Sequence, residues 1–408
     1  MNNINLRSKK LMIGLSLGHG IKHFGQGALL VMSPSIRTSL KISEIALGAI
    51  FTIQQMASVL TNIPAGIMAD MFRRHIPRLL AISMLLVGIG YMVVGLSNWY
   101  FLTLVAVLAI GSGTSMWHAP AFGTLASLYP NQKGLAMSAH LTGAQIGNTI
   151  SPIIIGFLLG GTLFNLQFKG IPWNFLSMSL AVPMGLTALI VLLRFKQSSN
   201  QNQNNLNLQQ YLDSSKRLIS NKVVLAMILL GAMRGAIHQS FGVFIVLHMR
   251  EVLAYSHFVV GLHLSLLTMA GIISTPLMGH VSDKVGRKPV ITSAMSLMSF
   301  VLFAFLYVDS GPLLTLLIGI LGLFIFSVMP IITAAAMDQV ETGTEGSITA
   351  LIFTGSGIVA AISPMIAGAI YGEYQFHGVV VMTGIIAVIS ALLSFVLPMT
   401  STKNKTVR

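Results

Sequence analysis

The stretch Gly279-His280-Val281-Ser282-Asp283-Lys284-Val285-Gly286-Arg287-Lys288 decides the fold, because an earlier stretch repeats its pattern. In the first half of the chain, Gly66-Ile67-Met68-Ala69-Asp70-Met71-Phe72-Arg73-Arg74 has the same Gly and Asp spacing but lacks the second Gly, and Phe72 directly precedes its basic pair. Both stretches follow a long apolar segment and end in a basic pair. Two copies of one loop predict a chain built from two similar halves.

A second repeated pattern supports two halves. Gly143, Gly147, Ser151 and Pro152 form a run that returns in the second half, in the stretch from Gly355 to Pro364. The two runs are separated along the chain by almost the same interval as the two loops. Glycine and proline are tolerated in membrane helices where helices pack closely or bend. We therefore expect this run to lie at a tight helix contact in each half.

Composition places the chain in a membrane. It has 408 residues, of which 54% are hydrophobic and only 8% charged. Soluble domains have about 25% charged residues, so we expect an integral, all-α membrane protein. Apolar runs long enough to span a bilayer number twelve, at 11–36, 45–69, 77–97, 100–126, 135–161, 173–195, 222–248, 257–280, 289–308, 312–337, 346–371 and 376–397.

The sixth and seventh runs are separated by an Asn- and Gln-rich stretch that is typical of a solvated connector. We therefore predict an N-terminal six-helix bundle at 1–195, a cytoplasmic linker at 196–221, and a C-terminal six-helix bundle with a short tail at 222–408. The two bundles would be pseudo-symmetric.

Basic residues in the loops predict the orientation. With the N-terminus inside the cell, the cytoplasmic side collects most Lys and Arg residues, and the other side has only Arg37, Lys41, Lys169 and Arg250. Cytoplasmic loops of membrane proteins are enriched in positive charge, so both termini should be cytoplasmic, in an inner-membrane protein. The net charge of +14 then reflects topology and attraction to the lipid bilayer, and no nucleic-acid partner is needed.

The first apolar segment contains a polar stripe. His19, Lys22, His23 and Gln26 lie at i, i+3, i+4 and i+7, which is one face of a helix. Lys at the centre of a membrane helix costs about 2.5–3.5 kcal/mol, so such a residue normally faces a bundle interior or a watery cavity. The stripe therefore predicts a cavity walled by the other helices.

The other polar groups inside the predicted helices are also basic. In the second half, Arg234 and His238 repeat the i, i+4 spacing of His19 and His23. The ten acids lie in loops or at helix ends, with Asp338 closest to the interior. A positive cavity favours an anionic solute, which Arg can grip through two parallel hydrogen bonds. The candidate substrate-binding residues are His19, Lys22, His23, Gln26, His118, His140, Arg234, His238 and Gln239.

Other chemistries are disfavoured. A single buried His is more often a packing residue than a ligand. Paired His residues have a spacing that suits a metal ion, but Lys22 and Arg234 would repel a free cation, and the chain has no Cys. We therefore expect no metal site and no cofactor. The nucleotide-binding pattern GxxxxGK[ST] is absent and no interior acid completes a Ser/His/Asp set, so we expect neither ATP-driven transport nor an enzyme.

The whole chain resembles the major facilitator superfamily through its twelve predicted helices, its two loop copies and its polar connector. The pattern from Gly111 to Pro120, which includes His118, and the run from Gly143 to Pro152 resemble the fosmidomycin-resistance-like exporters. Those exporters place an acid four residues after the helix-one His, whereas this chain has His23 there. A carboxylate-based proton site therefore cannot be carried over.

We therefore expect a monomeric, proton-coupled secondary transporter that works by alternating access. The basic interior predicts a small organic anion as the substrate, such as a polycarboxylate, a phosphonate or a carboxylate siderophore. The resemblance to the exporters implies that this anion is exported. Imidazoles, with pKa values of about 6.5 in water, could carry the protons. Uptake by proton/anion symport and a non-transporting membrane sensor are the alternatives. The resemblance also implies that the repeated loops form a cytoplasmic latch, from residues Gly66, Asp70, Arg73, Arg74, Gly279, Asp283, Gly286, Arg287 and Lys288.

Overall fold

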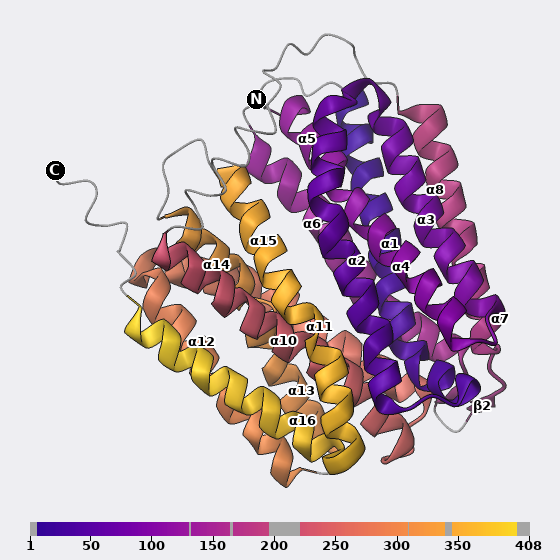
Figure 1. Cartoon of the computed structure of the whole chain (residues 1–408), viewed down its shortest axis with the longest axis vertical. Coiled ribbons are helices and arrows are strands. Elements are labelled where there is room, and N and C mark those ends of the chain that lie inside the picture. The colour runs from indigo at the N-terminus through magenta and orange to yellow at the C-terminus, as the bar shows by residue number, and fades with distance from the viewer. Residues whose placement is uncertain are drawn as a thin grey trace. The chain divides into compact units, whose positions relative to one another are not determined.

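The computed structural model describes residues 6–129, 132–163, 166–195, 221–308, 310–338 and 345–397, which are almost entirely helical (Figure 1). The first half contains α1 (Leu6–Leu40), α2 (Glu44–Met71), η1 (Arg73–His75), α3 (Ile76–Leu96), α4 (Tyr100–Met116), α5 (His118–Leu128), α6 (Lys133–Leu158), α7 (Trp173–Ser179) and α8 (Ala181–Arg194). The second half contains α10 (Lys222–Glu251), α11 (His257–Val285), α12 (Arg287–Ala304), η2 (Phe305–Tyr307), α13 (Pro312–Ile325), α14 (Val328–Met337), α15 (Glu345–Ala361) and α16 (Ser363–Val396). The all-α prediction is confirmed. A short antiparallel hairpin of β1 (Gly161–Leu163) and β2 (Leu166–Phe168) was not predicted.

The described helices are long and apolar enough for a polytopic membrane protein. Ten segments among the described residues could each cross a bilayer, and the segment Leu351–Val396, with 46 residues, contains parts of two predicted spans. Helix α1 has 35 residues, which also suffices for a crossing, although its polar stripe makes it less apolar. The helices are therefore consistent with the twelve predicted crossings.

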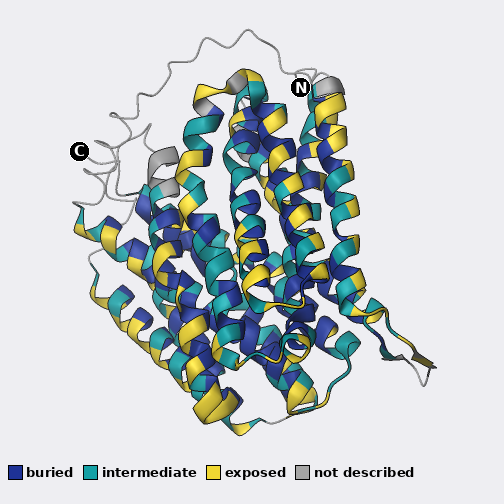
Figure 2. Ribbon diagram, turned by 45° about the vertical axis from the view of Figure 1, so that its right-hand side comes forward, coloured by how far each residue is buried: buried dark blue, intermediate teal, exposed yellow. Residues whose placement is uncertain are grey.

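Outward helix faces are apolar, as contact with lipid requires. Figure 2 shows exposed positions along the outer faces of many helices, alternating with buried positions that pack inward. On α8, for example, Leu186, Leu189 and Leu193 are each at least 50% exposed. Soluble monomers rarely expose apolar surface on this scale.

Proline residues explain why several predicted spans consist of two helices. Pro120 has no N–H to donate to the carbonyl of Met116, and α4 ends at Met116. The other two breaks also lie close to a proline. Helix α13 ends at Ile325, one and a half turns before Pro330, and α7 ends at Ser179, shortly before Pro183. The spans predicted at 100–126, 173–195 and 312–337 are thus single crossings with a break. In each, the break leaves backbone carbonyls in need of another donor.

The chain forms two compact units. The first comprises Met1–Ile42, Ile53–Asn205 and Tyr255–Ser265, and the second comprises Ser43–Thr52, Leu206–Ala254 and Leu266–Arg408. The first turns of α2 therefore belong to the second unit and those of α11 to the first. The contiguous boundaries at 195 and 222 stay a prediction, since the linker at 196–220 and the tail at 398–408 lie outside the described residues.

Each unit contains the same serine contact. In the first, the hydroxyl of Ser151 on α6 donates to the carbonyl of Phe24 on α1, with an O···O distance of 2.5 Å. In the second, Ser363 donates to the carbonyl of Ala236 on α10 at 3.3 Å. The interval along the chain between the two donors equals that between the two acceptors. The repeat predicted from the glycine and proline run is therefore a repeat of tertiary contacts.

Candidate functional site

Close packing between α1 and α6 holds the polar stripe of α1 in place. A Cβ atom on Gly147 would lie 2.1 Å from the carbonyl oxygen of Gly20, and one on Gly143 would lie 2.1 Å from that of Ser16. Both distances are far shorter than any real contact, so only glycine lets the two backbones touch. This contact and the hydrogen bond from Ser151 to Phe24 hold the polar stripe of α1 close to α6. The run of Gly143, Gly147 and Ser151 on α6 thus positions the candidate site.

His19 and His140 are stacked in the interior of the first unit. Their ring centroids are 4.1 Å apart with an interplanar angle of 17°. Nδ1 of His19 lies 3.0 Å from the carbonyl oxygen of His140, and both residues are buried. A carbonyl only accepts hydrogen bonds, so Nδ1 of His19 carries the hydrogen.

His23 forms a pair with His19, one turn before it on α1. Nε2 of His23 lies 3.2 Å from Nε2 of His19, and Nδ1 of His23 lies 3.3 Å from Oδ1 of Asn148 on α6. Asn148 orients the ring of His23 but is absent from the predicted site residues. Its position directly after Gly147, inside the repeated run, was the available signal.

Lys22 is fully buried next to α4 and α5. Its Nζ donates to the carbonyl of Thr114 at 3.1 Å and lies 2.9 Å from Nε2 of His118. Neither partner carries a negative charge. Thr114 belongs to the last turn of α4, where carbonyls have no helical partner and the helix dipole favours a cation. Lys22 therefore donates the hydrogen bond that the carbonyl of Thr114 lacks at the end of α4, and it also places an ammonium group among imidazoles.

Five predicted residues thus come together in the first unit. We call this group the histidine cluster, and it consists of His19, Lys22, His23, His118 and His140. Phe122 borders it, with its ring centroid 5.2 Å from that of His140 and 6.2 Å from that of His118. A buried lysine side chain surrounded by imidazoles, with no negatively charged partner among its described contacts, favours the binding of an anion nearby.

The second unit holds a smaller basic group around Phe326. Nε of Arg234 donates to the carbonyl of Ile325 at 2.5 Å, and its guanidinium carbon lies 5.8 Å from the ring centroid of Phe326. The ring of His238 meets Phe326 edge to face, with centroids 5.0 Å apart. Ile325 is the last residue of α13. Arg234 therefore stabilises the end of a broken helix as Lys22 does.

The contacts show which residues of the two basic faces are equivalent. Arg234 and His238 share the i, i+4 spacing of His19 and His23, but they do not stand at the same positions of the repeat. The serine contacts instead match Phe24 with Ala236, and the same interval along the chain makes Lys22 equivalent to Arg234 and Gln26 equivalent to His238. The equivalent residues are thus the two cations, each beside a helix break.

Gln26 and Gln239 are both half-buried, and the described contacts join neither of them to the basic groups. Gln26 follows His23 by one turn on the same face of α1, and Gln239 is adjacent to His238 on α10. Their assignment to the site stays a prediction.

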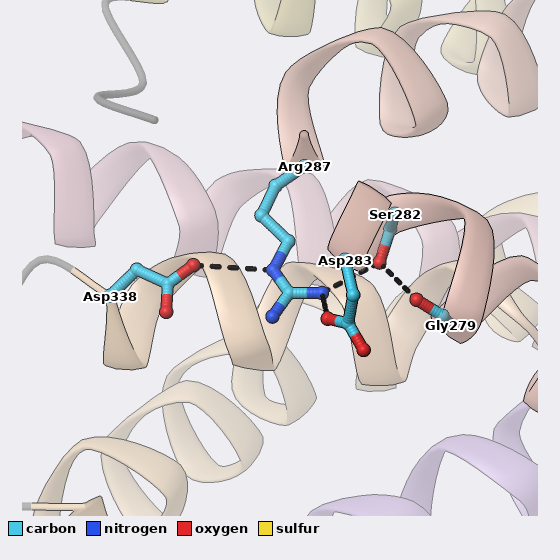
Figure 3. A network of polar contacts seen from close by, with 5 residues as sticks. All are labelled: Gly279, Ser282, Asp283, Arg287 and Asp338. Atoms are coloured by element: carbon cyan, nitrogen blue, oxygen red, sulfur yellow. Dashed lines mark hydrogen bonds and ion pairs between the residues drawn. The ribbon is translucent and has the colours of Figure 1, made fainter. Parts of the chain in front are cut away.

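The second copy of the predicted latch is a network centred on Arg287 (Figure 3). Its guanidinium binds Asp283, the hydroxyl of Ser282 at 2.6 Å, and Oδ2 of Asp338 at 3.2 Å. Asp338 follows α14 and was not predicted to take part. The side chains of Asp70 and Arg73, in the first copy, lie outside the described residues. Gly286 has φ +103°, a conformation that favours glycine, between α11 and α12.

Comparisons with known proteins agree with this architecture. The family model described as Major Facilitator Superfamily matches residues 15–271 and 223–408. The chain is 24% identical over 355 residues to the multidrug resistance protein MdtG of Yersinia enterocolitica, covering 85% of this chain and 82% of that protein. It is 23% identical over 359 residues to the fosmidomycin resistance protein of Escherichia coli, covering 86% and 85%.

Solved structures show the same fold. A bacterial homolog of the human lysosomal transporter Spinster superposes with a TM-score of 0.82 at 14% identity, covering 96% of this chain and 97% of that one. The nucleoside transporter NupG superposes with a TM-score of 0.73 at 16% identity, covering 94% and 97%. With this fold and a family match over nearly its whole length, the chain belongs to the major facilitator superfamily and is a membrane transporter.

Proposed function

We propose that this transporter moves a small organic anion across the bacterial inner membrane by alternating access. The observation that carries the proposal is the burial of Lys22 among imidazoles and backbone carbonyls, without a negatively charged partner among its described contacts. A buried ammonium is costly in a membrane, and an anionic solute would offset that cost when it binds. Arg234 supplies the second cation.

The nature of the two cations favours a carboxylate or phosphonate group. Arg presents a planar fork of donors that matches such groups through two parallel hydrogen bonds, whereas Lys acts as a point charge. Nε of Arg234 is engaged by the carbonyl of Ile325, and the rest of the guanidinium offers its remaining donors to a solute. Polycarboxylates, phosphonates and carboxylate siderophores are the solute classes that we propose.

We assign the direction as export, coupled to protons. The relatives named for multidrug and fosmidomycin resistance support export. Protons would be carried by imidazoles, since His19 and His23 already lie within hydrogen-bond distance of each other and exchange a proton without large movement. The solute would cross the membrane without chemical conversion. We further propose that both termini are cytoplasmic and that the transporter acts as a monomer.

An untargeted comparison of anionic metabolites tests this function. A deletion strain and its parent are compared, both inside the cells and in the spent medium. Export predicts an anion that accumulates inside the deletion strain and is depleted from its medium. An anion that stays in the medium and fails to enter would instead establish uptake. Equal pools for every anion, in cells and in media, would contradict transport of an anionic metabolite.

A further inference from the structure

Three imidazoles of the histidine cluster converge on one point. One ring nitrogen from each of His19, His23 and His118 lies within 4.8 Å of the other two. His19 and His23 come from successive turns of α1, and His118 is the first residue of α5. Three neutral imidazoles with lone pairs directed at one point are a recurrent ligand set for zinc and related ions.

The hydrogen bonds around the pair fix which nitrogens carry lone pairs. Nδ1 of His19 faces a carbonyl oxygen at 3.0 Å and Nδ1 of His23 faces the amide oxygen of Asn148 at 3.3 Å, so both Nδ1 atoms donate. In neutral rings, both Nε2 atoms then carry lone pairs, and these atoms face each other at 3.2 Å. Two lone pairs at that distance repel unless a proton or a metal cation lies between them.

We propose that His19, His23 and His118 form a binding site for a divalent transition metal ion of the zinc and cobalt class. A tetrahedral ion with bonds of about 2.0–2.1 Å to nitrogen holds its ligand atoms about 3.3 Å apart. The separation of 3.2 Å between the two Nε2 atoms already matches this value. The carbonyl of His140 and the amide of Asn148 are the outer partners that orient metal-binding imidazoles.

Lys22 competes with the ion for the third ligand. Its Nζ lies 2.9 Å from Nε2 of His118, so the ammonium occupies the lone pair that the metal would use. Metal binding therefore requires Lys22 to release His118, and the positive charge of Lys22 weakens the affinity. The charge of Lys22 predicts from the sequence that the cluster repels free cations. The three imidazoles can nevertheless bind a metal ion once Lys22 has released His118.

Three protein ligands leave a fourth position open. An anion in that position would offset the charge of the ion beside Lys22. This last step rests on the proposed anion transport and would make the carboxylate or phosphonate of the solute the fourth ligand. The three-imidazole site itself does not depend on it.

Titration of the purified, full-length protein with Co²⁺ alone tests the site. Tetrahedral Co²⁺ absorbs visible light strongly, whereas the hydrated ion absorbs weakly, so binding at the cluster gives a new visible band that Zn²⁺ removes. His23→Gln and His118→Gln should each weaken the Co²⁺ affinity by more than about 100-fold, beyond the usual loss for an outer-shell partner. Asn148→Leu should weaken it by about 10–100-fold.

Two variants separate ligand loss from misfolding. Lys22→Met should tighten Co²⁺ binding by at least about tenfold, because it removes a positive charge within hydrogen-bond distance of His118. A misfolded protein would not gain affinity. His263→Gln changes an imidazole of the same unit that contacts the carbonyl of Val259 and should leave the titration unchanged. A wild-type protein without the band, or a His23→Gln variant with wild-type affinity, would overturn the proposal. Neither result bears on anion flux, which is measured without added metal.

Discussion

Lys22 and Arg234 occupy equivalent positions in the two units, and each donates to a backbone carbonyl in the last turn of a broken helix. Nζ of Lys22 reaches the carbonyl of Thr114 on α4, and Nε of Arg234 reaches that of Ile325 on α13. Both carbonyls lie in the last turn of their helix, where no helical N–H is available to them, so they can accept hydrogen bonds from the two cations. Each cation is thus placed in the interior by its own unit, before any solute binds.

Replacing Lys22 by Met should leave stability nearly unchanged but abolish anion transport. Leaving the carbonyl of Thr114 and the nitrogen of His118 without their donor costs about 1–3 kcal/mol. Removing a charge from the middle of a membrane helix returns about 2.5–3.5 kcal/mol. Since the two nearly cancel, the thermal midpoint of the purified variant should stay close to that of the wild type. A collapse of stability would show that Lys22 serves mainly as a helix cap.

Gly147→Val should separate α1 from α6. The new Cβ atom would meet the carbonyl oxygen of Gly20 at 2.1 Å, so the backbones must move apart, at a cost of about 1–3 kcal/mol or more. We expect a lower thermal midpoint and loss of flux, because the histidine cluster depends on this contact. Gly14→Ala is the matched control on α1, since no atom lies within 4 Å of its added methyl group. Equal midpoints for both variants would contradict the close packing.

Asp338→Asn should disturb the latch more than Asp283→Asn. Both carboxylates bind Arg287, but the side chain of Asp338 is 18% exposed and that of Asp283 is 62% exposed. Water screens the exposed pair, which should be worth less than about 1 kcal/mol. The chain has no Cys, so a single cysteine introduced at a membrane-interior position reports access to a thiol reagent. Asp338→Asn should change the labelling rate of this cysteine at least twofold, and Asp283→Asn should not. A larger change in Asp283→Asn would contradict the greater contribution of Asp338 to the latch.

His23→Gln should uncouple transport from the proton gradient. The Gln side chain can retain a hydrogen bond to Asn148, but it cannot carry a proton. In proteoliposomes, we expect anion exchange at equal pH to persist while accumulation driven by a pH gradient falls at least tenfold. His263→Gln serves as the control imidazole. Unchanged accumulation would remove His23 from the coupling mechanism.

The pattern of polar and apolar residues predicted most of the helices and one side of the site. The stripe of α1 was visible because its residues are adjacent in sequence and repeat at helical spacing. The repeated glycine and proline runs likewise predicted a tight helix contact, since backbone contact requires small residues at fixed positions, whereas the partner helix, α1, is known only from the structure.

Features that depend on tertiary structure were not predicted. The shared i, i+4 spacing drew attention to His19 and Arg234, whereas the equivalent serine contacts make Lys22 the counterpart of Arg234. Asn148 and Asp338 were missed because their roles come from partners far away in the sequence, His23 and Arg287. The convergence of three imidazoles also requires α5 to start where Pro120 breaks the span, which a helical pattern does not reveal.

Flux of the identified anion through Arg234→Gln in proteoliposomes tests the central claim most directly. The variant keeps a side-chain amide that can still donate to the carbonyl of Ile325, but it has no charge with which to bind an anion. Arg234→Lys, with a charge but no planar fork, is the matched comparison. We predict that Arg234→Gln loses at least about 90% of the flux, a tenfold decrease that corresponds to about 1.4 kcal/mol. Arg234→Lys should keep part of the flux. Wild-type flux in the folded Arg234→Gln protein would contradict anion binding by Arg234 and Lys22.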